Sequence, residues 1–386
     1  MALNLTSRQA RRSVLLGITA ASLALSGCQL LRRGPDRPLP PAPRPVPAPV
    51  VPVEGERNKV AVIVPLTGPD GGVGTSISNA ANLALADSGE KSLQITIYDS
   101  AGPGGAKGAA QRAVAEGNGL ILGPLLAEDV SAATPITREA GVPMIAFSND
   151  ESVASKGVFI MGFTPSQSIG RVVEFAKERG VARYAALVAS GLYGQRAAQA
   201  LLGAARRNGG QVATVETFNR TPAAAATAAR KLKAKGGYDA VLLGDSGRIA
   251  ATIAPIIGAG PRIIGTELWA NDKSLGKTPA LRGAWYAAAP DVQFQRMVTR
   301  YRARYGKTPY RLGSLGYDAV LLAVRSSRDW PIGRPFPAST LIDREGFSGV
   351  DGNFRFGRDG VAERLLEVRQ VTPAGTIVVS PAKRAF

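Results

Sequence analysis

The chain has 386 residues, with 47 lysines and arginines against 29 aspartates and glutamates, so its formal net charge is +18. This length predicts about two compact units. The sequence has no histidine and one cysteine, Cys28. It therefore lacks the residues for Ser-His-Asp and Cys-His catalysis, for histidine-ligated metals and for an internal disulfide. Carboxylate, Ser-Lys and nucleotide chemistry remain possible, as does binding without catalysis.

Residues 1–27 are predicted to be an export signal. A basic start precedes an apolar run of about a dozen residues, shorter than the roughly 20 that a membrane-spanning helix needs. The run ends in Leu25-Ser26-Gly27-Cys28, which resembles a bacterial lipobox and implies cleavage before Cys28 and acylation of that cysteine. A buried thiol behind an ordinary signal is the alternative.

Residues 28–57 are predicted to be a spacer between this lipid anchor and the folded body. Nine of the eighteen residues at 35–52 are proline, which favours an extended polyproline conformation. A ligand for a proline-recognition domain is the alternative for this segment. The arginine pair at 11–12 leaves both general and twin-arginine export open. We expect the protein on the periplasmic side of the envelope, with the outer membrane preferred over the inner one.

The body from Asn58 onward keeps 39 basic and 26 acidic residues, a net charge of +13. Such an excess commonly indicates nucleic-acid binding. For an exported, lipid-anchored protein we instead expect anionic lipids, envelope polymers or an acidic partner, and no nucleic acid.

Short apolar runs alternate with Ala-rich amphipathic segments along this body, which predicts an α/β fold with parallel strands. Strands are expected at 60–65, 94–99, 120–122, 143–147, 184–189, 212–217, 240–243, 262–265 and 284–288. A glycine-rich loop at 67–74 is expected to lead into a helix at 75–87, and further helices are expected at 105–116, 128–140, 292–305 and 312–325. Turn signals such as Asp351-Gly352 predict a β-rich tail at 350–379.

Several short motifs occur in an order that is typical of one protein family. They are Pro-Leu-Thr-Gly after the first strand, Ile121-Leu122-Gly123-Pro124, Phe163-Thr164-Pro165 and Gly191-Leu192-Tyr193-Gly194. Together they resemble the type I periplasmic binding proteins of the leucine-binding kind, over residues 58–386. The resemblance implies two doubly wound lobes joined by three crossovers, with no enzymatic activity and no cofactor.

The resemblance also implies where the chain passes between lobes. The crossovers are expected near Phe163, near Pro290 and between Ser326 and Phe347. Lobe 1 would then comprise about 58–163 and 290–326, and lobe 2 about 164–289 and 327–386.

Ligands of open α/β sheets bind at the carboxyl ends of the strands, and the resemblance implies that these ends face a cleft between the lobes. The candidate residues for a ligand or partner in this cleft are Thr67, Gly74, Ser76, Leu125, Glu128, Ser148, Asn149, Asp150, Tyr193, Asp245, Glu267 and Trp269. For Trp269, burial in the core is the alternative to stacking on a ligand. No catalytic residue or metal ligand is expected among them.

Two enzyme-like motifs have simpler explanations. The glycine loop lacks the lysine of a P-loop and the last glycine of GxGxxG, so a tight strand-to-helix turn is expected. Ser88 and Lys91 have the SxxK spacing of Ser-Lys acyl transferases. Gly89 between them suits a helix C-cap, so we expect Ser88 to end a helix.

The amino-acid site that the resemblance implies is only half present. In amino-acid-binding members, hydroxyl residues at the start of one helix hold the ligand's α-carboxylate, but this sequence has Ala127-Glu128-Asp129 there. Carboxylates at that place would repel the ligand's own carboxylate. On the amine side, Tyr193 matches the family's cleft tyrosine, and Asp245 or Glu267 could pair with an ammonium group.

A second resemblance suggests a different function. Residues 123–130, Tyr238-Asp239-Ala240-Val241 and the tail at 364–378 resemble the binding-protein domain of lipoprotein activators of penicillin-binding proteins. This implies contact with a peptidoglycan synthase, which is the first hypothesis. The alternative is a substrate-binding lipoprotein of an ABC importer for amino acids or small amides, with an ABC permease as partner. Its ligand would be held by Thr67, Ser76, Ser148, Tyr193 and Asp245.

The shape of the cleft distinguishes the two hypotheses. A pocket of roughly 300 Å³ or more with convergent polar groups indicates a small ligand. A collapsed or apolar gap indicates a protein contact.

Overall fold

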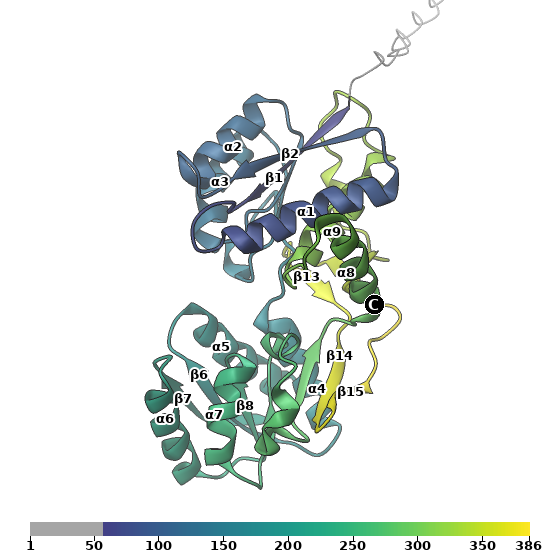
Figure 1. Ribbon diagram of the computed structural model, residues 1–386. Coiled ribbons are helices and arrows are strands. Elements are labelled where there is room, and N and C mark those ends of the chain that lie inside the picture. The colour runs from purple at the N-terminus through teal and green to yellow at the C-terminus, as the bar shows by residue number, and fades with distance from the viewer. Residues whose placement is uncertain (1–56) are drawn as a thin grey trace, which may run out of the picture. The chain divides into compact units, whose positions relative to one another are not determined.

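The computed structural model describes residues 57–386. The predicted signal, Cys28 and the proline spacer as far as residue 56 lie outside the described residues. Residues 57–386 form a parallel five-stranded sheet and a mainly parallel seven-stranded sheet, both with helices on their two faces, and one small antiparallel sheet, which confirms the predicted α/β fold (Figure 1).

The first lobe is built on a five-stranded parallel sheet with the order β2-β1-β3-β4-β5. Its strands are β1 (Asn58–Val64), β2 (Leu93–Asp99), β3 (Leu120–Leu122), β4 (Met144–Ala146) and β5 (Val158–Ile160). Its helices are α1 (Gly71–Ser88), α2 (Gly105–Ala115), α3 (Ala127–Glu139), α8 (Val292–Tyr305) and α9 (Gly313–Ser327), with a 3-10 turn η1 at Glu151–Val153.

Alternate residues of β1 point to opposite faces of this sheet, as the two-residue period of a strand requires. Val60 and Val62 pack in the core beneath α1 and α9, whereas Ala61 and Ile63 pack beneath α2 and α3. Figure 1 shows these two pairs of helices on either side of the sheet. Both faces are therefore covered, which is why the strands read as continuous apolar runs.

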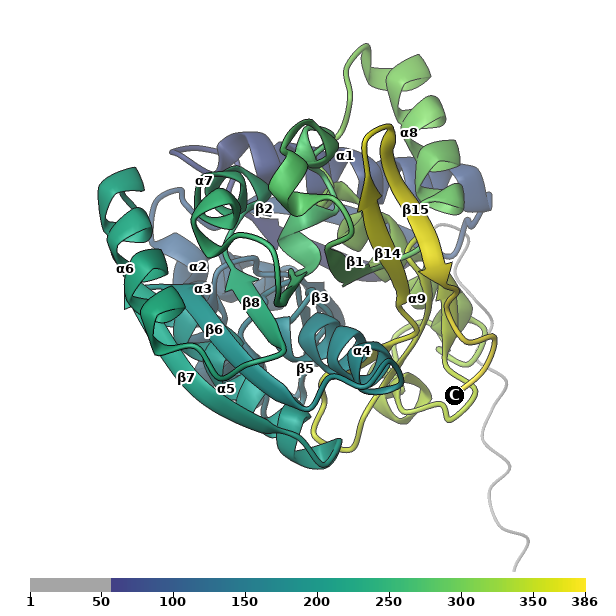
Figure 2. The same cartoon turned by 90° about the horizontal axis from the view of Figure 1, so that it is seen from below.

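The second lobe is built on a seven-stranded sheet with the order β15-β14-β10-β9-β8-β6-β7. Its strands are β6 (Arg183–Ala189), β7 (Gln211–Phe218), β8 (Ala240–Gly244), β9 (Arg262–Ile264), β10 (Trp285–Ala288), β14 (Glu367–Thr372) and β15 (Gly375–Ser380). Its helices are α4 (Pro165–Lys177), α5 (Leu192–Arg207), α6 (Pro222–Lys235) and α7 (Gly247–Ile257). Four 3-10 turns complete the described elements: η2 (Glu267–Trp269), η3 (Leu275–Lys277), η4 (Pro279–Leu281) and, after α9, η5 (Ala338–Leu341). The tail adds the antiparallel hairpin β14–β15, whose strands lie side by side in Figure 2.

The start of α1 differs from the prediction. The helix begins at Gly71, so half of the expected glycine loop is helical. A Cβ on Gly74 would lie 1.7 Å from the carbonyl oxygen of Pro65, so glycine lets this first turn pack directly on the preceding backbone. At the other end, Gly89 caps the helix in the left-handed conformation, which confirms that Ser88 ends a helix. Strand β5 was not predicted from the sequence.

The third crossover lies later in the chain than expected. Trp330, Phe336 and Phe354 all belong to the hydrophobic core of the first lobe, and Leu366 is the first later residue in the core of the second. The strands β11 (Phe347–Gly349), β12 (Gly352–Phe356) and β13 (Ala362–Arg364) form the small antiparallel sheet, which packs on α9 through its aromatic residues. The expected boundary at 326–347 was wrong because hairpin signals show strands without showing which core they join.

Candidate functional site

A cavity of about 460 Å³ lies at the carboxyl ends of the strands of both lobes. The residues that line it come from the start of α1, the loops after β3, β4 and β9, the end of β10, the first crossover and the loop before α9. They are Asp70, Val73, Leu125, Leu126, Phe147, Asn149, Phe163, Glu267, Leu268, Ala270, Asn271, Ala288, Ala289, Tyr310, Arg311 and Leu312. Ten of these sixteen residues are apolar, so most of the wall offers no hydrogen bond.

Glu267 is one of the few charged or polar residues of the wall, but its carboxylate is already bonded. It accepts a hydrogen bond from the hydroxyl of Ser168, and its Oε1 lies 2.8 Å from the hydroxyl of Tyr193. Burial raises the pKa of Glu267 and, together with the nearby Glu267 charge, raises that of Tyr193. Two of the three residues expected on the amine side of an amino-acid site, Tyr193 and Glu267, therefore bind each other.

Arg311 is the basic residue of the wall. Its Nη1 donates to the hydroxyl of Ser314 at 2.9 Å and forms an ion pair with Asp351. The guanidinium carbon lies 4.0 Å from the ring centroid of Phe294 and 5.4 Å from that of Phe163. Within residues 57–386, no hydrogen bond uses the Nε or Nη2 of Arg311.

Arg311 belongs to a buried cluster of four charges near the crossovers. Asp351 has no exposed surface, and Asp318 on α9 accepts hydrogen bonds from the backbone N–H groups of Val350 and Asp351. Burial, and next the charge of Asp351, raise the pKa of Asp318 to about 7. Arg364, the fourth member, donates from Nη2 to the carbonyl of Met161 at 2.6 Å, while its Nε and Nη1 are buried with no hydrogen-bond partner among the described residues.

The remaining predicted residues do not line the cavity, because their polar atoms serve local structure. Ser76 and Ser148 are buried and accept hydrogen bonds from the backbone N–H groups of Tyr310 and Asp150. Thr67 donates to Asp99 at 2.8 Å, and Glu128 is exposed at the start of α3. Of the twelve candidates, the structure brings together Leu125, Asn149 and Glu267 in one cavity.

Asp150, Asp245, Trp269 and Gly74 likewise have structural partners. Asp150 pairs with Arg196 at 2.7 Å, and Asp245 pairs with Arg220 at 2.9 Å. The indole of Trp269 is fully buried and donates to the backbone carbonyl of Asp245, so it is a core residue and not a stacking surface. The five residues expected to hold an amino-acid ligand thus have polar partners within the protein, and none of them is among the residues that line the cavity: Thr67, Ser76, Ser148, Tyr193 and Asp245.

Comparison with known proteins identifies the family. Residues 58–376 match the model of a family described as periplasmic binding protein. The chain belongs to this family. Membership implies a periplasmic location, and it agrees with the two lobes and the cavity at their strand ends.

Individual relatives of this periplasmic binding protein are distant in sequence. An uncharacterized protein of Rickettsia prowazekii is 24% identical over 331 residues, which cover 82% of this chain and 86% of that protein. A leucine-binding protein of Thermotoga maritima is 22% identical with a TM-score of 0.63, over 84% of this chain and 98% of its own. A solute-binding protein of an ABC transporter from Rhodopseudomonas palustris, in complex with 3,4-dihydroxybenzoic acid, is 22% identical with a TM-score of 0.66, over 85% and 96%. These structures establish a shared type I fold.

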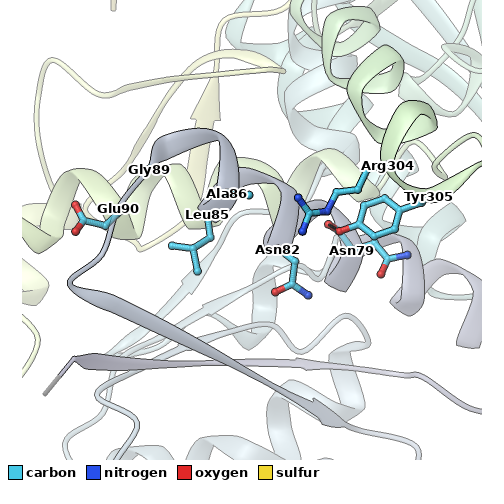
Figure 3. A pocket seen from close by; sticks show the side chains of 8 residues that line it. All are labelled: Asn79, Asn82, Leu85, Ala86, Gly89, Glu90, Arg304 and Tyr305. Carbon is cyan, nitrogen blue, oxygen red and sulfur yellow. Dashed lines mark hydrogen bonds between the residues drawn. The ribbon is translucent and has the colours of Figure 1, made fainter. Parts of the chain in front are cut away.

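A second, more open depression of about 620 Å³ lies between α1 and the end of α8 in this periplasmic binding protein. Figure 3 shows its side chains along α1, just after the end of α1 and at the end of α8, with Glu90 and Arg304 far apart. The hydroxyl of Tyr305 donates to the carbonyl of Asn79 at 2.9 Å, so polar groups here bond to each other. The depression lies in one lobe, away from the strand ends, and the cavity at those ends remains the candidate site.

None of the helices within residues 57–386 is long and apolar enough to cross a membrane. The same part of the chain contains no group of three or more cysteine, aspartate or glutamate side chains placed to hold a metal ion.

Sequence reasoning missed Arg311 and Asp70, which line the cavity beside Leu125. Asp70 directly precedes α1, in the loop that the sequence did single out, so its position could have been inferred. Arg311 gave no such signal, because it precedes a helix and follows no strand. Its place in the cavity depends on how α9 packs against α1.

Proposed function

We propose that this periplasmic binding protein is the solute-binding component of an ABC importer and that its cavity holds one small, largely apolar solute. The observation that carries the proposal is the cavity of about 460 Å³ with walls from both lobes. Small-molecule sites commonly measure about 300–1,000 Å³ and combine an apolar lining with a few polar groups. The cavity matches that description in size, and the charged or polar residues of its mostly apolar wall supply the few polar groups: Asp70, Asn149, Glu267, Asn271, Tyr310 and Arg311.

The lining argues against a zwitterionic α-amino acid as the solute. Helix α3 opens with Ala127-Glu128-Asp129, where the resemblance to amino-acid-binding members implies hydroxyl residues, and Glu267 already accepts hydrogen bonds from Ser168 and Tyr193. The solutes in related structures include 3,4-dihydroxybenzoic acid and benzoate as well as leucine and isoleucine. A solute with a large apolar surface and one polar end suits this cavity better than one with two charged ends.

Isothermal titration calorimetry on the purified protein tests the proposal. The panel comprises leucine, isoleucine, phenylalanine, 4-methylpentanoate, benzoate and 3,4-dihydroxybenzoate. We expect saturable one-to-one binding of at least one compound. Leu126→Trp should fill the cavity and abolish that binding, whereas the control Leu202→Trp, on the exposed surface of α5, should not. Binding that survives Leu126→Trp, or no binding by any compound, would contradict the proposal.

One observation favours contact with a peptidoglycan synthase as a second candidate function. The cavity rim exposes large apolar side chains, with Leu268 at 37% and Tyr310 at 57% exposure. Apolar surface of this kind is also typical of protein contacts. A pull-down against envelope synthases with Tyr310→Ala as the comparison tests this: retention of a synthase that is lost in the variant supports the second function, and no retention contradicts it.

A further inference from the structure

We propose that the solute of this cavity is a small apolar carboxylic acid without an α-ammonium group, and that Arg311 binds its carboxylate. This inference rests on the proposed function, since it names the class of solute that the same cavity takes. The guanidinium of Arg311 is held in place and has two N–H donors, on Nε and Nη2, that form no hydrogen bond with residues 57–386.

The position of Arg311 is fixed by contacts on one side of its guanidinium. Nη1 is engaged by Asp351 and by the hydroxyl of Ser314, and the group rests on the ring of Phe294. Only 10% of the side chain is exposed, and the residue lines the cavity. A group held in this way loses little freedom when it binds a ligand.

The two remaining N–H donors of Arg311, on Nε and Nη2, have the geometry that binds a carboxylate. Nε and Nη2 form no hydrogen bond with residues 57–386, and neither atom is among the buried polar atoms that lack a partner. These two N–H groups lie side by side on the planar guanidinium and point in the same direction. Arginine uses this edge to bind carboxylates through two parallel hydrogen bonds.

The charges of the cluster around Arg311 balance when all four groups are ionised. Two guanidinium groups, Arg311 and Arg364, then face two carboxylates, Asp318 and Asp351. Because the pKa of Asp318 is raised, part of the population near neutral pH has one carboxylate against two guanidiniums. The ring of Phe163 lines the cavity and lies 4.7 Å from the guanidinium carbon of Arg364, so this second cation is close to the cavity wall.

The two carboxylates of the wall differ in their surroundings. Glu267 is buried and already accepts hydrogen bonds from the hydroxyls of Ser168 and Tyr193. Asp70, the other carboxylate, lies at the N-terminus of α1, where the positive end of the helix already offsets its charge. An apolar acid can bury its hydrocarbon part against Leu125, Leu126 and Phe163 and present one negative group to Arg311.

Calorimetry with matched compounds tests this inference. The pairs are 4-methylpentanoate with 4-methylpentanamide and benzoate with benzamide, and leucine adds an ammonium group to the first acid. We expect at least one acid to bind about tenfold tighter than its amide. We also expect 4-methylpentanoate to bind at least about tenfold tighter than leucine. Arg311→Gln should weaken the acid about tenfold and change the amide less than twofold. Lys307→Gln, which removes a charge at an exposed position outside the cavity wall, serves as the control and should preserve the preference for the acid.

Because Asp351 is buried beside Arg311, Arg311→Gln could fail to fold, which circular dichroism and thermal melting will show. Arg311→Lys keeps the charge but lacks the two-pronged edge, so it should weaken the acid to a value between those of the wild type and Arg311→Gln. If Arg311→Gln does not fold, the inference is tested by the ratio of acid to amide affinity in the wild type and by the acid affinity of Arg311→Lys. Equal binding of acid and amide, or leucine as tight as 4-methylpentanoate, would overturn the inference while leaving the proposed function intact. Binding of no compound at all would instead remove the proposed function.

Discussion

The guanidinium of Arg196 on α5 lies 2.7 Å from the carboxylate of Asp150, so one ion pair joins an element of each lobe. Asp150 is only 5% exposed and also accepts a hydrogen bond from the backbone N–H of Ser152. Arg196 donates a second hydrogen bond to the hydroxyl of Ser152 at 2.8 Å. This contact therefore stabilises the observed arrangement at one edge of the cleft.

Removing the charge of Arg196 should destabilise the protein measurably. Arg196→Gln leaves a largely buried carboxylate without its cation, for which we expect a loss of about 1–2 kcal/mol in the free energy of unfolding. The control is Lys383→Gln, which removes an exposed pair with Glu174 at 3.4 Å and should cost less than about 0.5 kcal/mol. Urea denaturation measures both, and equal losses in the two variants would contradict the structural role of the Arg196 pair.

The buried cluster at Asp318 predicts a pH dependence of stability. The pKa of Asp318 is raised from 3.8 to about 7 in the folded state, so between these values the folded protein binds a proton that the unfolded chain does not. Stability should therefore fall as pH rises from 5 to 8, with most of the loss below pH 7. Melting temperatures across this range measure the effect.

Asp318→Asn should flatten this dependence, because the amide oxygen can still accept from the N–H of Val350 and the side chain no longer titrates. Asp329→Asn is the control, since Asp329 is exposed just after α9 and should leave the slope unchanged. If Asp318→Asn keeps the wild-type slope between pH 5 and 8, a different group is responsible.

The sequence predicted the sheets well and the cavity only in part. Buried parallel strands are short apolar runs bounded by glycine and proline, and this local signal placed β1, β3 and β8 to within a few residues. The small sheet of β11 to β13 was assigned to the wrong lobe, because its phenylalanines record burial but not the partner against which they are buried.

Polar residues were harder to assign than strands. Ser76 and Ser148 have side chains suited to binding a ligand, yet backbone N–H groups that approach from Tyr310 and Asp150 use their hydroxyls. Arg311 is one basic residue among many in the sequence. What sets Arg311 apart is that Asp351 and Phe294 hold its guanidinium in place beside the cavity. These two residues are distant from Arg311 in the sequence and close to it in the fold.

Neighbouring residues of η2, Trp269 and Leu268, should respond in opposite ways to substitution. Trp269 is fully buried and donates to the carbonyl of Asp245 at 2.9 Å, so Trp269→Phe should lower the free energy of unfolding by about 2–3 kcal/mol. Leu268 is 37% exposed on the cavity wall, so Leu268→Ala should cost less than about 1 kcal/mol but weaken solute binding. Chemical denaturation and calorimetry on both variants check this. A stable Trp269→Phe protein that has lost solute binding would show that Trp269 contacts the ligand after all.

Two glycines in the first turn of α1 provide a sharper comparison, because an added Cβ would meet backbone at one and a side chain at the other. A Cβ on Gly74 would lie 1.7 Å from the backbone oxygen of Pro65, which cannot move without displacing β1. A Cβ on Gly72 would meet only the end of the Tyr310 side chain, at 3.2 Å. Gly74→Ala should therefore cost about 3 kcal/mol or more, whereas Gly72→Ala should change stability by less than about 0.5 kcal/mol. Urea denaturation of the two variants measures the difference. Comparable stabilities would mean that the turn can shift away from Pro65, and that glycine at position 74 is kept for some other reason than close backbone packing.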